Sequence, residues 1–508
     1  MTTVLPQKER RGKDTNQRDE DRKIKCFFSA PYTSSMKHAP FHIHFIGYAL
    51  VLAILGGFGM GGHVVFVIAF NYPPSIYLGP MIQAHGHLQL LGWAGLFIMA
   101  VSSHMLPRLT NAKPPSKLIL NSMLWCMVVG LLSRSMSHFM LVNQELDSLS
   151  RPLMAISGLL EAIAIGLYLK IIVTCVKEHR PQLNAFAASG IRPFLFTTLL
   201  GWPAFAVANL LVALHFSLGK AMLINQEWNT LLNSSFTELV ILPVCFAFSI
   251  NTLPVFLRLR TPTWPVFKIA LAYTLSTLLQ ILFDVIFLTS RESWCLLLST
   301  AFSAVRAMSI LWFIWELDIL TRLRAPWFRK FRQTDNRDSR PPRKNAADYG
   351  QFGHFEWFIT GGYICLAIAA IGELINAACR LLLEMQQDFL GVDVIRHLYL
   401  LGFVSMLILG MAVRLVPGFV GMNRIAMPRL VSASFVLILL ALIFRILPPL
   451  TWPYADVFFF KALWGTSGIW GMLAIMCLAA NLFVTNRKAR GFLIERVEKR
   501  TQCAINTK

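Results

Sequence analysis

Histidines near the ends of apolar segments are the residues of this sequence best suited to chemistry. The chain has 12 histidines among 508 residues. An ionisable side chain is costly inside a membrane and usually serves a function there. Neutral imidazoles bind haem iron and other transition metals, so the pattern predicts a haem or metal site. The histidines that share one end of the apolar segments are His63, His85, His87, His138, His215 and His397.

Two of these histidines occupy equivalent positions in a repeated segment. HLQLLG from His87 matches HLYLLG from His397, and in both segments a proline follows the histidine by 20 residues. A weaker third copy ends at Pro254 and has Ser234 in place of histidine. Membrane proteins built from repeats often bind ligands between them. We therefore expect His87 and His397 to face each other across a central cavity and to ligate a haem iron from its two sides.

The neighbouring His85 suggests a second metal site. Residues two apart on a helix point about 200° apart, so His85 and His87 cannot ligate the same iron. His63 is the first candidate partner of His85, with His215 or His138 behind it, and imidazole-rich sites suit copper, iron and zinc. The alternative is that His85 and His63 only make polar contacts between packed helices.

Charged residues inside the apolar segments are a second set of candidates. Arg396 and Arg380 lie near the same end as the histidines and are expected to pair with haem propionates. Glu238, on the third copy of the repeat, and Glu373 are the carboxylates of greatest interest. Buried charges of this kind either form a proton path or neutralise one another as ion pairs, and both readings stay open. The full set is Arg134, Glu161, Glu238, Asp284, Arg306, Glu373, Arg445 and Lys461.

The composition places these residues in a membrane. Charged residues make up 14% of the chain and hydrophobic residues 55%, which excludes a soluble enzyme, a disordered chain and a disulfide-stapled secreted domain. The net charge of +21 comes from Lys and Arg at the ends of apolar runs, so we expect a lipid bilayer as partner and no nucleic acid. The nine cysteines form no C-x-x-C pair, so covalent haem attachment is not expected.

The apolar runs predict an all-α, polytopic membrane protein of about twelve helices, arranged as three pseudo-repeated four-helix units. The repeated segments fall in the second, sixth and tenth spans. A glycine-rich run at 56–62 lies inside the first span and predicts close helix packing instead of a nucleotide-binding loop. The predicted spans are 41–70, 81–106, 118–140, 152–175, 193–218, 231–256, 264–289, 295–320, 355–378, 391–416, 427–450 and 458–485.

Lys and Arg orient the predicted bundle, because cytoplasmic connections retain them. They are concentrated before the first span, after the last, and in alternate loops, which places both termini in the cytoplasm. The predicted organisation is a polar, basic tail at 1–40, a membrane domain at 41–485 with a basic cytoplasmic linker at 321–353, and a basic tail at 486–508.

The segments around His87 and His397 resemble the NnrS family of haem- and copper-containing membrane proteins with twelve helices. That family is associated with bacterial responses to nitric oxide and with denitrification, and it is similar to subunit I of the haem-copper oxidases. The resemblance implies a haem-copper-oxidase-like bundle in the bacterial inner membrane, with haem, copper and nitric oxide as ligands. It also implies that His87 or His85, together with His397, corresponds to the low-spin haem ligands.

The sequence departs from the oxidase pattern at the second metal centre. Haem-copper oxidases carry a histidine in helix 6, a His-His pair in helix 7 and two ligands in helix 10, whereas here helices 6 and 7 have none and helix 10 has only His397. An oxidase-type binuclear centre is therefore not possible, and whether the chain is an enzyme stays open. The roles that remain are haem-based nitric oxide binding, protection of iron chemistry from nitric oxide, or a role not yet defined.

Two other kinds of function compete with the haem hypothesis. In one, the twelve helices form a transporter or a proton or metal channel that uses buried histidines and carboxylates without haem. In the other, the chain is a membrane scaffold for a respiratory complex. A haem protein would show a Soret band, a transporter would show solute flux without one, and a scaffold would co-purify with partners.

Overall fold

The computed structural model describes residues 41–110, 112–177, 185–219, 221–257, 259, 265–321, 348–383, 389–451 and 457–506. Within these ranges the chain contains helices and no β-strand, and 12 of the helices are long and apolar enough to cross a membrane. The prediction of an all-α, polytopic membrane protein is confirmed. The predicted tail at 1–40 and all but the ends of the predicted linker at 321–353 lie outside the described residues.

The first unit of four spans holds the first copy of the repeat. Ser116 caps its third span by accepting a hydrogen bond from the backbone N–H of Ile119. The spans consist of α2 (Ile43–Leu52), η1 (Ala53–Gly59) and α3 (Met60–Ala69); α4 (Leu78–His87), η2 (Leu88–Gly95) and α5 (Leu96–Thr110); α6 (Lys117–Met140); and, after a short turn η3 (Gln144–Leu146), α7 (Asp147–Lys177).

The second unit holds the weaker copy of the repeat. Asn225 caps the start of its second span by accepting from the backbone N–H of Glu227. The spans consist of α8 (Ala185–Leu218); α9 (Gln226–Phe236), η4 (Thr237–Ile241) and α10 (Leu242–Phe256); α11 (Val266–Ser290); and α12 (Ser293–Leu317).

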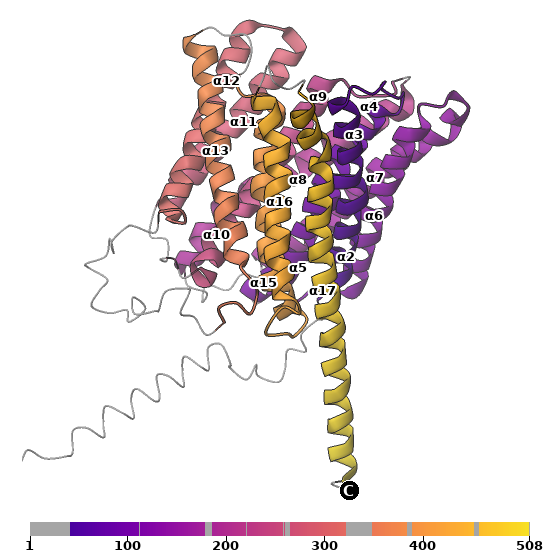
Figure 1. Cartoon of the computed structure of the whole chain (residues 1–508), viewed down its shortest axis with the longest axis vertical. Coiled ribbons are helices and arrows are strands. Elements are labelled where there is room, and N and C mark those ends of the chain that lie inside the picture. Colours follow the sequence, from indigo (N-terminus) through magenta and orange to yellow (C-terminus); the bar gives the residue numbers. More distant parts are fainter. Residues whose placement is uncertain are drawn as a thin grey trace, which may run out of the picture. The chain divides into compact units, whose positions relative to one another are not determined.

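The third unit ends in the longest helix of the described chain. That helix, α17, continues past the predicted limit at 485 to Asn506 and extends well beyond the other helices (Figure 1). The first residues of the predicted tail at 486–508 are therefore a continuation of the last span. The spans consist of α13 (Phe355–Leu382); α14 (Val392–His397), η7 (Leu398–Ser405) and α15 (Met406–Phe419); α16 (Pro428–Leu450); and α17 (Phe458–Asn506).

The three repeat spans share a local distortion at the same place. The π-helical segment η2 begins directly after His87, and η7, of the same eight-residue length, begins directly after His397. In the weaker copy the shorter π-helical segment η4 begins at Thr237, three residues after Ser234. π-Helical turns are rare and often occur at functional sites. Their equivalent placement supports the three-unit repeat and singles out this level of the membrane.

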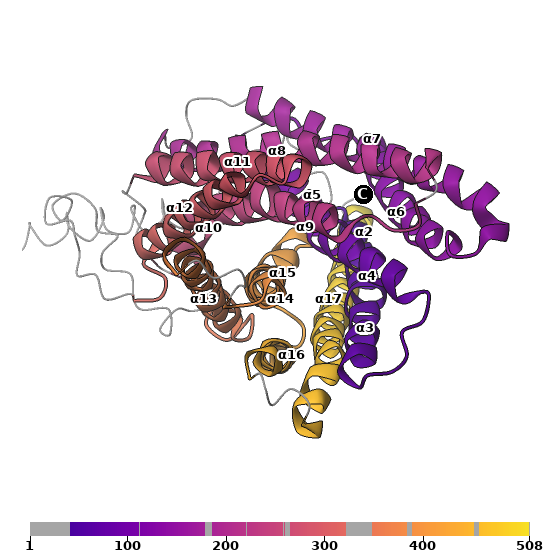
Figure 2. The same cartoon turned by 90° about the horizontal axis from the view of Figure 1, so that it is seen from above.

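The three repeat spans also form the interior of the bundle. Of the residues in their apolar segments, 78, 61 and 89% are buried, against 22–50% in the other nine spans. Seen from above, α14 and α15 are enclosed by α13, α16 and α17 and by the helices of the other units (Figure 2). The repeat spans are therefore the ones whose side chains can contact a ligand shielded from lipid.

The glycine-rich run in the first span allows two helices to touch along their backbones. A Cβ atom on Gly468 of α17 would lie 2.3 Å from the Cα of Gly62 in α3, and a Cβ on Gly471 would lie 2.3 Å from the ring of Phe58. Small residues at such contacts are typical of membrane helix packing. The predicted role of this run in close packing is confirmed.

Candidate functional site

His85 is held by the first span. Its Nδ1 lies 2.8 Å from the backbone carbonyl oxygen of Gly57 in η1, and its ring lies so close to Gly61 that a Cβ there would be 2.5 Å from Cε1. Because a carbonyl oxygen only accepts, Nδ1 must carry the proton, which leaves a lone pair on Nε2. This arrangement, with Nδ1–H on a backbone carbonyl, is the usual one for a metal-ligating histidine.

His397 has the same arrangement on the third unit. Its Nδ1 lies 2.7 Å from the carbonyl oxygen of Asp393, one turn earlier, and 3.3 Å from the Oδ1 of the same residue. Both are acceptors, so Nδ1 again carries the proton. Nε2 accepts a hydrogen bond of 3.2 Å from Nε of Arg445 on α16, and Arg445 also donates to Oδ2 of Asp393 at 2.7 Å.

The two imidazoles belong to one electrostatic environment. His85 is close enough to His397 and Arg445 for their charges to act on it. His85 of the first unit and His397 of the third thus lie in one electrostatic environment, and each has an acceptor Nε2, that of His397 accepting from Arg445. The pair sits on the last turns of α4 and α14, directly before the π-helical segments.

His87 points to a different part of the first unit. Its Nε2 lies 3.0 Å from Oε2 of Glu161 on α7, whose side chain is fully buried. The same carboxylate oxygen accepts from Nδ2 of Asn209 at 2.6 Å, and Oδ1 of Asn209 accepts from the buried guanidinium of Arg134 at 2.6 Å. A carboxylate only accepts, so Nε2 of His87 carries a proton and is not available to a metal.

The remaining histidines of the predicted site are more scattered. His63 on α3 and His215 on α8 are exposed, whereas His138 is buried and packs edge-on against Phe216 at a centroid distance of 5.5 Å. Within the described ranges, no group of three or more His, Cys, Asp or Glu side chains could hold a metal ion. The predicted copper site at His63 and His85 stays a prediction.

The two arginines predicted to meet propionates are both half-buried. The guanidinium of Arg396 lies 3.5 Å from Oγ1 of Thr230 on α9, and it is adjacent to His397 in sequence. Arg380 on α13 acts electrostatically on Asp284 of α11. Arg396 is thus close to the imidazole pair, and Arg380 belongs to the acidic side of the second unit.

A separate cluster of charges joins the second and third units. The side chain of Arg306 on α12 is only 3% exposed and forms ion pairs with Glu238 of η4 and Glu373 of α13, the second at 2.6 Å from Nη2 to Oε1. Tyr273 donates to the backbone carbonyl of Glu238 at 2.6 Å. The two carboxylates that the sequence singled out are therefore bridged by one cation.

Sequence reasoning missed the groups that orient the histidines. Asp393 precedes His397 by four residues on a helix, a spacing that places two side chains on one face and could have been found. Arg445 and Gly57 reach the site from other spans. The sequence placed Arg445 among the charged residues within spans and Gly57 in the glycine-rich run, but spacing did not indicate that either contacts a histidine.

No protein-family model matches this sequence, and a search of curated proteins gives no significant match.

Proposed function

We propose that this chain is an integral membrane haem protein in which His85 and His397 ligate the iron. The observation that carries the proposal is the matched state of the two imidazoles. Each has its Nδ1 proton on an oxygen acceptor, and each therefore has an acceptor Nε2, which in His397 accepts from Arg445 and would have to exchange that N–H for the iron. Axial ligation of haem needs such a pair of neutral imidazoles.

The surrounding residues fit this role. The Gly57 carbonyl and Asp393 fix the two rings and make their Nε2 atoms better donors to a metal. Arg445 and Arg396 supply the positive charge that haem propionates require. Haem held by these two residues would supply reversible one-electron chemistry, and it would bind nitric oxide where that molecule replaces one of the two imidazoles. Because Glu161 engages His87, we assign His87 to anchoring α4 against α7 and not to the iron.

The resemblance to the NnrS family supports a role in nitric oxide response or nitrogen-oxide metabolism in a bacterial inner membrane. The basic segments support cytoplasmic termini. The absence of histidine from the sixth and seventh spans argues for nitric oxide binding or protection from it, and against reduction at an oxidase-type centre. Copper is not part of this proposal, because His85 is assigned to haem.

Absorption spectra of the detergent-purified protein, oxidised and dithionite-reduced, test the haem assignment. We expect a Soret band in the wild type, its loss in His85→Ala and in His397→Ala, and its retention in His87→Ala. His215→Ala, at an exposed histidine, is the matched control. A wild type without a Soret band from haem-replete cells would contradict the proposal, and loss of the band in His87→Ala but not in His85→Ala would reassign the ligand.

Proton-coupled transport is the second candidate. Its support is the cluster around Arg306, where two buried carboxylates share one guanidinium. The single positive charge of Arg306 cannot neutralise two carboxylates, so the cluster can bind a proton or another cation. A wild type without haem would favour this candidate.

A further inference from the structure

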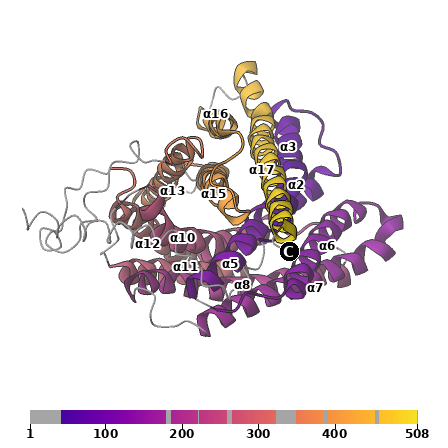
Figure 3. The ribbon, with the colours of Figure 1, turned by 90° about the horizontal axis from the view of Figure 1, so that it is seen from below.

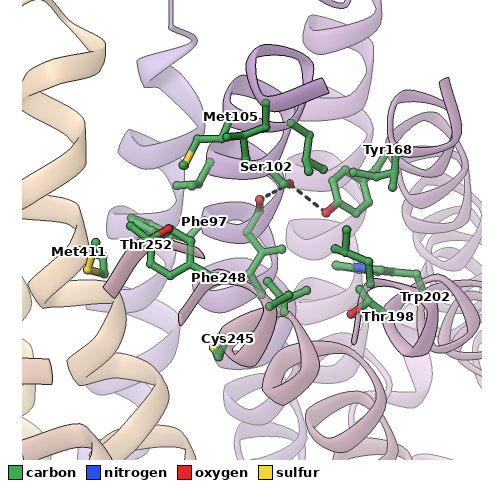
Figure 4. Close-up of a pocket in the computed structure, with 18 of the residues that line it drawn as sticks. Phe97, Ser102, Met105, Tyr168, Thr198, Trp202, Cys245, Phe248, Thr252 and Met411 are labelled. Carbon is green, nitrogen blue, oxygen red and sulfur yellow. Dashed lines mark hydrogen bonds between the residues drawn. The ribbon is translucent and has the colours of Figure 1, made fainter. Parts of the chain in front are cut away.

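A cavity of about 130 Å³ lies inside the bundle, and no histidine lines it (Figure 4). It is lined by residues of α5, α7, α8, α10 and α15. A dry, apolar cavity of about 150 Å³ binds a single benzene ring. The space is therefore sized for the ring of a small molecule.

The cavity lies where the three copies of the repeat meet. Seen from below, α5, α10 and α15 lie next to one another (Figure 3). The same repeat positions line the cavity in every copy. The residues ten positions before the repeat prolines are Phe97, Val244 and Leu407. The residues two positions before the same prolines are Met105, Thr252 and Leu415.

Most polar groups that line the cavity already have partners. Ser102 donates to the carbonyl oxygen of Ile98, so the 2.9 Å contact between Ser102 Oγ and the Tyr168 hydroxyl has Tyr168 as donor. The hydroxyl of Thr198 donates to the carbonyl oxygen of Phe194 at 3.0 Å. These hydroxyls already donate to acceptors within the protein, so they do not require a ligand.

Trp202 is different. Its side chain is fully buried, and its Nε1 has no hydrogen-bond partner among the described residues. The nitrogen edge of the indole is directed into the cavity (Figure 4). A buried N–H without an acceptor is destabilising and is rarely left in that state. An acceptor bound in the cavity would resolve it.

The side chains that line the cavity determine how polar the rest of the ligand can be. They are mainly aliphatic and aromatic, so a charged or strongly polar molecule is excluded. The lining residues Met105, Leu106 and Leu109 are only half-buried, so the cavity is not sealed on that side. The occupant is therefore a compound soluble in lipid, with an apolar body and a hydrogen-bond acceptor.

We propose that this cavity binds the ring of a lipid-soluble carbonyl compound of the quinone class, with a carbonyl oxygen accepting a hydrogen bond from Nε1–H of Trp202. The ring lies among the three repeat spans, and the acceptor lies on the α8 side. The proposal concerns binding alone and does not depend on haem.

Two probes of one shape separate the carbonyl from the ring. Duroquinone carries two carbonyl oxygens, and durene has the same tetramethylated ring without them. Neither alkylates a thiol, which matters because Cys245 lines the cavity. Binding is measured by equilibrium dialysis of radiolabelled probe against detergent-purified full-length protein, with empty micelles as the blank.

Trp202→Phe removes the N–H and keeps an aromatic side chain, although a smaller one, so durene binding reports the effect of the added space. We expect it to weaken duroquinone binding by about three- to tenfold, the effect of one neutral hydrogen bond, and to leave durene binding within about twofold. Trp470→Phe is the matched control, because Nε1 of Trp470 also lacks a partner in the described structure but lies outside the cavity. It should change neither probe.

Cys245→Phe fills the cavity and should abolish binding of both probes. The proposal is overturned if Trp202→Phe leaves duroquinone binding unchanged, if durene binds as tightly as duroquinone, or if the filled variant still binds. A monodisperse elution profile of each variant shows that the loss of binding is not a loss of fold.

Discussion

Replacing Arg306 by methionine should strongly destabilise the bundle. The guanidinium is 3% exposed and lies between Glu238 and Glu373, whose side chains are each 12% exposed. Arg306→Met keeps an unbranched apolar chain of similar length but removes the cation, so that two carboxylates face each other in a buried site. Removal of one partner from a buried ion pair costs about 3–5 kcal/mol.

The opposite change should be mild. Glu373→Gln keeps the shape and an oxygen that accepts from Nη2 of Arg306, and it leaves one cation with one anion. We expect a loss of less than about 1 kcal/mol in the free energy of unfolding, because the one guanidinium only partly compensates the negative charges of two carboxylates. Arg306→Met combined with Glu238→Gln and Glu373→Gln should recover most of the stability lost by Arg306→Met alone.

The free energy of unfolding can be followed by far-UV circular dichroism during titration of mixed micelles with SDS. Equal losses in Arg306→Met and Glu373→Gln would refute the reasoning, because they would mean that the excess negative charge has no energetic consequence. A loss below about 1 kcal/mol in Arg306→Met would refute it as well, since the ion pairs would then contribute little.

Two further predictions use the same unfolding assay. Gly468→Ala should lose about 1–3 kcal/mol, because its Cβ would meet the backbone of Gly62, whereas Gly166→Ala, with open space around its Cβ, should lose nothing. Equal effects at both glycines would show that the backbone contact is not tight. Glu161→Gln should lose about 1.5–3 kcal/mol through its weakened bond to His87 and leave the Soret band in place. A lost band would instead connect His87 to the iron.

Much of the architecture follows from the sequence, because length and hydropathy decide which segments cross a membrane. The twelve predicted spans agree with the helices to within a few residues at most ends, and the clear exceptions are the start of α8, at Ala185 against a predicted 193, and the end of α17. The repeat around His87 and His397 was visible as matched residues, and the structure places η2 and η7 at the same point in each copy. Depth in the membrane is proportional to position along a helix, so the level of the histidines could also be predicted.

The partners of each histidine could not be predicted. The angle of about 200° between His85 and His87 shows that they point apart, but it does not show which span each of them contacts. That choice depends on how α4 is rotated about its axis. Gly61 leaves room for the ring of His85, and the Gly57 carbonyl holds it, so His85 is turned toward the first span and His87 toward Glu161.

The same distinction holds for the charges and for the cavity. The sequence determined that Glu238, Arg306 and Glu373 lie within spans, but only packing decided that one guanidinium bridges both carboxylates. The sequence likewise gave no sign of the unpartnered N–H of Trp202, because an unmet donor is a property of its surroundings. Position along a helix is set by local order in the chain, whereas rotation and contact are set by the fit of side chains from distant segments.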